Sequence, residues 1–99
     1  MTEKEFFETL EEDGPPEGLS PALKALWFAE KGDWDQAHRI AQDDDTSEGR
    51  WVHAYLHREE GDTGNAHYWY RRAGKTMPDL SVEDERRAII RELLQAGET

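Results

Sequence analysis

The sequence predicts an all-α protein on two observations. No segment of the 99-residue chain alternates apolar and polar residues with a period of two, which is the pattern of a half-buried strand. Small and turn-forming residues also recur at an offset of 29 residues, in the order Ala, Gly, Asp, Ala. Glycine commonly ends a helix, aspartate caps the next one, and alanine lets two helices approach closely, so the repeat predicts two tandem antiparallel helical hairpins. Its members are Ala25, Gly32, Asp33 and Ala37 in the first copy and Ala54, Gly61, Asp62 and Ala66 in the second.

The expected single domain, residues 1–99, begins with a helix and a break over residues 1–16. Thr2 followed by Glu5 has the pattern of a capping box, in which two side chains satisfy free N–H groups of the first turn. The segment Gly14-Pro15-Pro16 is expected to stop this helix, because proline interrupts helical hydrogen bonding. The apolar stripe of the helix consists of Phe6, Phe7 and Leu10.

The first hairpin is expected over residues 20–44. Ser20 followed by Pro21 predicts the start of its first helix, since serine caps helices and proline is favoured at the first helical position. Asp33 with Gln36 predicts the start of its second helix. The acidic run over residues 43–45 is expected to form a solvated loop that ends the hairpin.

The second hairpin is expected over residues 45–78, with Asp45 and Glu48 capping its first helix. This helix carries apolar residues on two sides, which predicts a central position in the fold. Asp62 is expected to start the second helix, and Pro78 follows its end.

A last helix is expected over residues 81–96, where Ser81 with Asp84 forms another capping box. Two hairpins are fewer than the roughly three repeats that a stable open solenoid needs. The N-terminal and C-terminal helices are therefore expected to flank the hairpins and cover their open ends.

The composition excludes several classes of function. With a formal net charge of −11, most of the molecule repels phosphates, so neither nucleic acids nor membranes are expected partners. The chain contains no cysteine, which fits a cytoplasmic protein, and no apolar run is long enough for a signal peptide or a membrane span. The charge is uneven, because residues 46–78 sum to +1, and an anionic partner is expected to bind there.

The second copy of the repeat adds three residues at the spacing of known helical repeats, namely Tyr70, Ala73 and Pro78. The chain therefore resembles the tetratricopeptide and Sel1-like repeat families, although Ala41 and Asp44 take the places of the first two in copy one. This resemblance implies a tetratricopeptide-like scaffold that binds partners on a concave face lined by the first helix of each hairpin. Residues 51–74 also resemble a family of short uncharacterised proteins, a resemblance that implies no activity.

One stripe of the expected concave face combines aromatic and basic residues. Trp51, Tyr55 and Arg58 recur at helical spacing on the first helix of hairpin two. Leu26 lies on the equivalent stripe of hairpin one. Because such side chains are typical of binding hot spots, these four are the expected partner-binding residues, and Arg58 favours a partner with an acidic segment. The stripe is equally compatible with a core position under a flanking helix.

The histidines allow two interpretations. His53 and His57 stand one helical turn apart, a spacing that lets two imidazoles bind one metal ion. A third ligand would have to be Glu60 or His67, neither of which completes a known motif, so no metal and no other cofactor is predicted. The favoured interpretation is that His53 and His57 fill inward positions and hydrogen-bond to neighbours. In the alternative, His53, His57, His67 and Arg71 line a pocket between the hairpins.

The sequence alone therefore predicts a small helical-repeat module that binds a protein or peptide segment. No catalytic triad is recognisable, so an enzyme is not the favoured class. The second hypothesis is a small-molecule binder or enzyme that uses the pocket of histidine, arginine and aromatic residues. A solvent-filled cavity reached by the histidines would favour this second hypothesis, and a dry histidine layer would favour the first.

Overall fold

The computed structural model describes residues 1–97, which form helices joined by turns and short loops. No strand occurs in this part of the chain, so the prediction of an all-α protein is confirmed. Over the same residues, no helix has both the length and the apolar surface that a membrane-spanning segment requires. The elements in chain order are α1 (Glu3–Glu8), the 3-10 turn η1 (Thr9–Glu11), α2 (Pro21–Glu30), α3 (Trp34–Asp43), α4 (Ser47–Glu60), α5 (Thr63–Arg72) and α6 (Val82–Ala96).

Polar side chains start each of the six α-helices within residues 1–97, and five of these caps are the predicted ones. In each, the side chain accepts a hydrogen bond from the backbone N–H three residues later, which satisfies a donor that the helix leaves free. The five caps are Thr2, Ser20, Asp33, Asp62 and Ser81.

The predicted cap of α4 is wrong by one residue. Its cap is Thr46, whose hydroxyl accepts a hydrogen bond from the backbone N–H of Gly49 at 3.0 Å. The carboxylate of Asp44 fixes Thr46 by accepting from its N–H at 3.1 Å and from its hydroxyl at 2.8 Å. The carboxylate of Asp45 instead pairs with Arg50 at 2.9 Å.

The turns that end α2 and α4 have the same backbone geometry at the predicted offset. Gly32 and Gly61 adopt φ angles of 80° and 92°, a left-handed conformation that glycine adopts without steric cost. Each glycine N–H donates to a carbonyl three residues earlier at 3.0 Å. The next residues, Asp33 and Asp62, each donate their N–H to a carbonyl five residues earlier at 2.9 Å. The repeat in the sequence thus corresponds to a repeated turn and cap.

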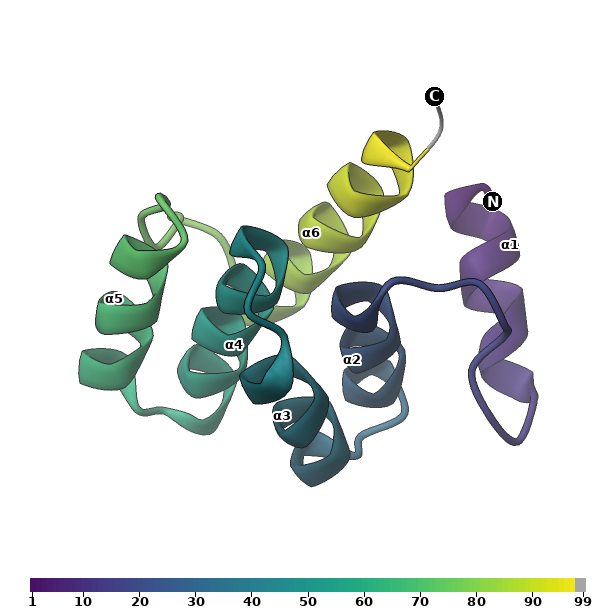
Figure 1. The fold of residues 1–99 in the computed structure, drawn as a ribbon, viewed down its shortest axis with the longest axis horizontal. Coiled ribbons are helices and arrows are strands. Elements are labelled where there is room, and N and C mark those ends of the chain that lie inside the picture. Colours follow the sequence, from purple (N-terminus) through teal and green to yellow (C-terminus); the bar gives the residue numbers. More distant parts are fainter. Residues whose placement is uncertain (98–99) are drawn as a thin grey trace.

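Helix α4 occupies the centre of the molecule, as its two apolar sides predict (Figure 1). It contacts α2, α3, α5 and α6, while α2 also packs against α3 and α1 contacts α6. The main apolar cluster joins side chains of α1, α2, α3, α4 and α6. A smaller cluster between α4 and α5 consists of Ala54, Ala66 and Tyr70.

Two residues of the stripe expected on an open concave face, Leu26 and Tyr55, lie beneath α6. Leu26 and Tyr55 are fully buried, in one cluster with Ile89 and Ile90 of α6. Leu26 and Tyr55 therefore belong to the core, which is the second of the two interpretations of this stripe. The structure has no open face at either residue. A small domain gains stability by burying its few large apolar groups, which explains why α6 covers them.

Candidate functional site

Three of the four histidines meet between α3 and α4. His53 and His57 lie one turn apart on α4 and are 6% and 7% exposed. His38 projects from α3 toward them and is half-buried. The ring centroids of His38, His53 and His57 are separated by 4.8 to 5.1 Å, so the rings form a nearly equilateral triangle. We refer to these three residues as the histidine cluster.

Two tryptophans border the histidine cluster. Trp34 stacks on His38 with the ring centroids 4.7 Å apart and the planes inclined by 9°. Its indole N–H donates to the carbonyl of Leu56 at 2.8 Å, which fixes the ring between α3 and α4. On the other side, Trp69 of α5 stacks on His53 at a centroid distance of 4.1 Å. The cluster therefore lies between two large aromatic surfaces that restrict the motion of its rings.

Burial lowers the pKa values of two of the three rings in the histidine cluster. The Nε2 atoms of His38 and His53 are 3.1 Å apart, so one donates and the other accepts. Burial, with the neighbouring His57 and His38, lowers the pKa of His53 to about 4. Burial and His57 also lower the pKa of His38. Both rings are consequently neutral at neutral pH, while the Nδ1 atom of His57 lies 2.7 Å from a carboxylate oxygen of Glu60.

Only two of the four residues predicted to line the alternative pocket lie close together. His53 and His57 lie together, whereas His67 and Arg71 are exposed on α5 and have no place in the cluster. His38 takes the place that was expected for His67. His38 and His67 are separated by the 29-residue offset of the repeat, and this spacing is the sequence signal that could have identified His38. His38 faces α4, while His67 points to solvent because α5 packs mainly on α4.

A buried carboxylate on α6 holds Arg58, one of the expected partner-binding residues. Glu85 is 2% exposed and accepts a hydrogen bond from the Arg58 guanidinium at 2.7 Å. Tyr70 of α5 donates its hydroxyl to the other oxygen of Glu85. Arg58 also donates to the carbonyl of Leu80. The hydrogen bond from Arg58 to Glu85 raises the pKa of Arg58, whereas burial and Glu85 raise the pKa of Tyr70. Arg58 is therefore committed to internal contacts.

A second arginine joins α6 to α2 and α4. Arg86 donates at 2.8 Å to the carboxylates of Glu30 and Glu59 and to the hydroxyl of Tyr55. The same hydroxyl donates to Glu59 at 3.0 Å. Burial and the nearby Glu59 raise the pKa of Tyr55, so the phenol keeps its proton. These bonds act as structural links between three helices.

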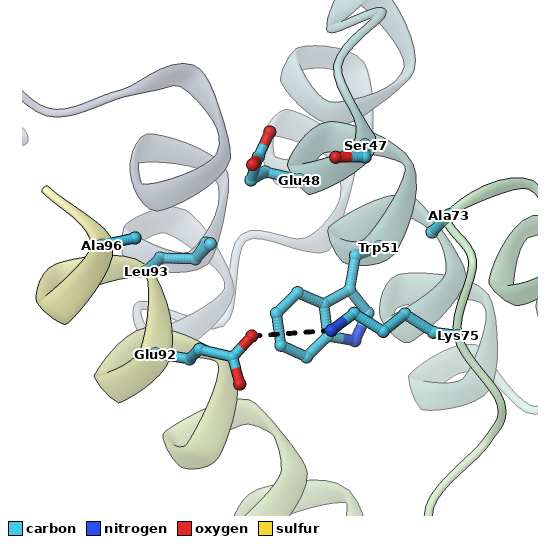
Figure 2. Close-up of a pocket in the computed structure, with 8 residues that line it drawn as sticks. All are labelled: Ser47, Glu48, Trp51, Ala73, Lys75, Glu92, Leu93 and Ala96. Atoms are coloured by element: carbon cyan, nitrogen blue, oxygen red, sulfur yellow. Dashed lines mark ion pairs between the residues drawn. The ribbon is translucent and has the colours of Figure 1, made fainter.

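Trp51, another expected partner-binding residue, borders a cavity between α4 and α6 (Figure 2). The cavity has a volume of about 130 Å³. In the close-up, the Lys75 side chain extends across the Trp51 ring toward Glu92. Its ammonium lies 4.2 Å from the ring centroid and 3.5 Å from the carboxylate. Trp51 thus presents an aromatic face that already contacts a cation.

Two further cavities continue from this one along the same end of the helices. The second, of about 250 Å³, shares the lining residues Glu48, Leu93 and Ala96 with the first. The third, of about 400 Å³, shares Pro21 and Asp44 with the second. We call these three adjoining cavities the end groove. It extends from Trp51 to the start of α2 and the end of α3, and none of the cluster histidines lines it.

The chain matches no protein-family model, no curated protein and no solved structure at a significant level. The resemblance to tetratricopeptide and Sel1-like repeats therefore stays a prediction from the sequence.

Proposed function

We propose that the protein is a tetratricopeptide-like interaction module that binds a basic segment of a partner protein in the end groove. Its two hairpins are α2 with α3 and α4 with α5, flanked by α1 and α6. The equivalent hydrogen bonds at Gly32 and Gly61 support this arrangement, because a repeated turn and cap gives successive hairpins a similar local shape.

The single observation that carries the proposal is the end groove with Trp51 at one end. The concave stripe has no room for a partner, since α6 buries Leu26 and Tyr55. The end groove, in contrast, is open along α2, α3, α4 and α6. Trp51 is half-buried there, and an aromatic side chain at the edge of a concave surface is the composition of an interaction hot spot.

The charge of the end groove determines the expected chemistry of the partner. Its lining contains more carboxylates than ammonium groups, which favours cationic side chains and speeds their association. Arg58, whose charge in the sequence favours a partner with an acidic segment, is already paired with Glu85. A lysine or arginine of the partner can take the place of Lys75 over the Trp51 ring. The charged lining residues are Asp43, Asp44, Asp45, Glu48 and Glu92 on one side and Lys24 and Lys75 on the other.

We expect peptides selected from a displayed random library to be rich in lysine and arginine. Trp51→Leu should weaken their binding by about tenfold or more, since it removes a cation–π contact and aromatic area. Glu92→Gln should weaken binding less, and raising the salt concentration should weaken it in the wild type. Fluorescence anisotropy of the labelled peptides measures all three effects.

Glu83→Gln is the matched control, because Glu83 is an exposed carboxylate of α6 that does not line the end groove. It should leave the affinity unchanged. Peptides without an excess of basic residues would contradict the proposal. So would equal binding to the wild type and to both the Trp51→Leu and Glu92→Gln variants.

A further inference from the structure

We propose that the histidine cluster binds one divalent transition-metal ion such as Zn²⁺. This site is separate from the end groove. His38, His53 and His57 each bring one ring nitrogen within 4.8 Å of the other two. Imidazole nitrogens suit Zn²⁺, Cu²⁺ and Ni²⁺, whereas Mg²⁺ and Ca²⁺ prefer oxygen ligands.

The positions of the nitrogens are close to those of a tetrahedral site. Zn–N bonds of about 2.0–2.1 Å place two nitrogens of a tetrahedron about 3.3 Å apart. The Nε2 atoms of His38 and His53 are 3.1 Å apart, and a metal ion replaces the hydrogen bond between them once the donating ring carries its proton on Nδ1. A ring nitrogen of His57 lies within 4.8 Å of the other two ligand atoms, so binding requires a side-chain movement that brings it to the same separation. Three imidazoles then occupy three positions, and the fourth is left for water or another donor.

Glu60 prepares His57 for this role. Its carboxylate lies 2.7 Å from Nδ1 of His57 and accepts the proton of that nitrogen, which leaves Nε2 with its lone pair for the metal. A carboxylate behind a histidine ligand fixes the tautomer and the ring orientation. Glu60, one of the third ligands considered from the sequence, thus acts on the site through His57. His38 supplies the third imidazole.

The surroundings of the cluster also favour a metal. Trp34 and Trp69 stack on His38 and His53 and hold the rings in place, which lowers the entropy lost on coordination. His38 is the most exposed of the three, so an ion can reach the cluster from its side. The three rings also converge on one another, with centroids 4.8 to 5.1 Å apart, so one ion can contact all three.

The test is calorimetric titration of tag-free, chelator-treated protein with zinc sulfate. We expect one zinc ion per chain and a rise in the melting temperature when zinc is added. Cobalt(II) should give the intense visible absorption of a tetrahedral site, a readout that needs no variant. Glu60→Gln should weaken zinc binding by about 10–100-fold, as loss of a supporting carboxylate does.

His38→Gln is the ligand variant of choice, because His38 is only half-buried and the fold tolerates its replacement best. It should weaken zinc binding by about 100-fold or more, exceeding the effect expected for Glu60→Gln. His67→Gln is the matched control, since it removes the one histidine outside the cluster. Absence of stoichiometric zinc binding to the wild type would overturn the proposal. So would loss of binding in His67→Gln, or unchanged binding in a folded His38→Gln variant.

Discussion

Replacing Tyr55 by alanine is expected to destabilise the protein by about 3–5 kcal/mol, the range for deleting a buried aromatic side chain. Tyr55 is fully buried in the main apolar cluster between α2, α4 and α6. Its hydroxyl also joins Arg86 and Glu59, which lose a shared partner in the variant. Urea denaturation of Tyr55→Ala beside the wild type measures the change in the free energy of unfolding.

Tyr68→Ala is the control for this substitution, because Tyr68 is 44% exposed on α5. It should change the free energy of unfolding by about 1 kcal/mol or less, because its contacts with Trp69 and Arg72 lie at the surface. Tyr55→Phe keeps the ring and removes only the hydroxyl, so about 1–3 kcal/mol is expected. A wild-type midpoint for Tyr55→Ala would mean that the stripe on α4 is exposed rather than covered by α6.

Glu85→Ala is expected to destabilise the protein by about 3–5 kcal/mol, since it leaves a poorly exposed guanidinium without its counter-charge. The side chains of Arg58 and Glu85 are 16% and 2% exposed, and Tyr70 donates to the same carboxylate. Thermal and urea denaturation report the loss.

The double variant Arg58→Met with Glu85→Leu removes both charges and should recover much of this stability, because apolar side chains can replace a buried ion pair at little cost. Glu92→Ala is the control on the same helix. Glu92 is largely exposed and its pairing with Lys75 at 3.5 Å contributes only about 0–1 kcal/mol. A Glu85→Ala variant as stable as Glu92→Ala would contradict the assigned role of Glu85.

The parts of the fold that depend on neighbouring residues could be predicted from the sequence. A cap acts over three residues and a helix-ending glycine over five, so Ser20, Asp33 and Gly61 identify helix boundaries directly. The failure at Asp45 shows the limit of this reasoning. Asp44, Asp45 and Thr46 are all suitable caps, and no local pattern indicates that Thr46 takes the cap position while Asp44 accepts from its hydroxyl.

The parts that depend on distant residues could not be predicted in the same way. Arg86 reaches Glu30, which is far away in the sequence, and no local pattern indicates that pair. The covering of the α4 stripe by α6 depends on such contacts. His53 and His57 were recognisable by their helical spacing, whereas His38 required knowledge of how α3 packs against α4. Its relation to His67 through the repeat was the only sequence signal for it.

Helix α6 docks over α2 and α4, and Leu26 and Tyr55 are fully buried in one cluster with its side chains. Native-state hydrogen exchange of α6 tests this docking most directly. The amides of Ile89 and Ile90 should exchange with the same free energy as those of Tyr55 and Leu56, because all four side chains are fully buried in one cluster. A free energy of opening for the α6 amides that is several kcal/mol lower than that of the α4 amides would contradict the docking of α6. That result would mean that α6 opens independently and exposes the concave stripe.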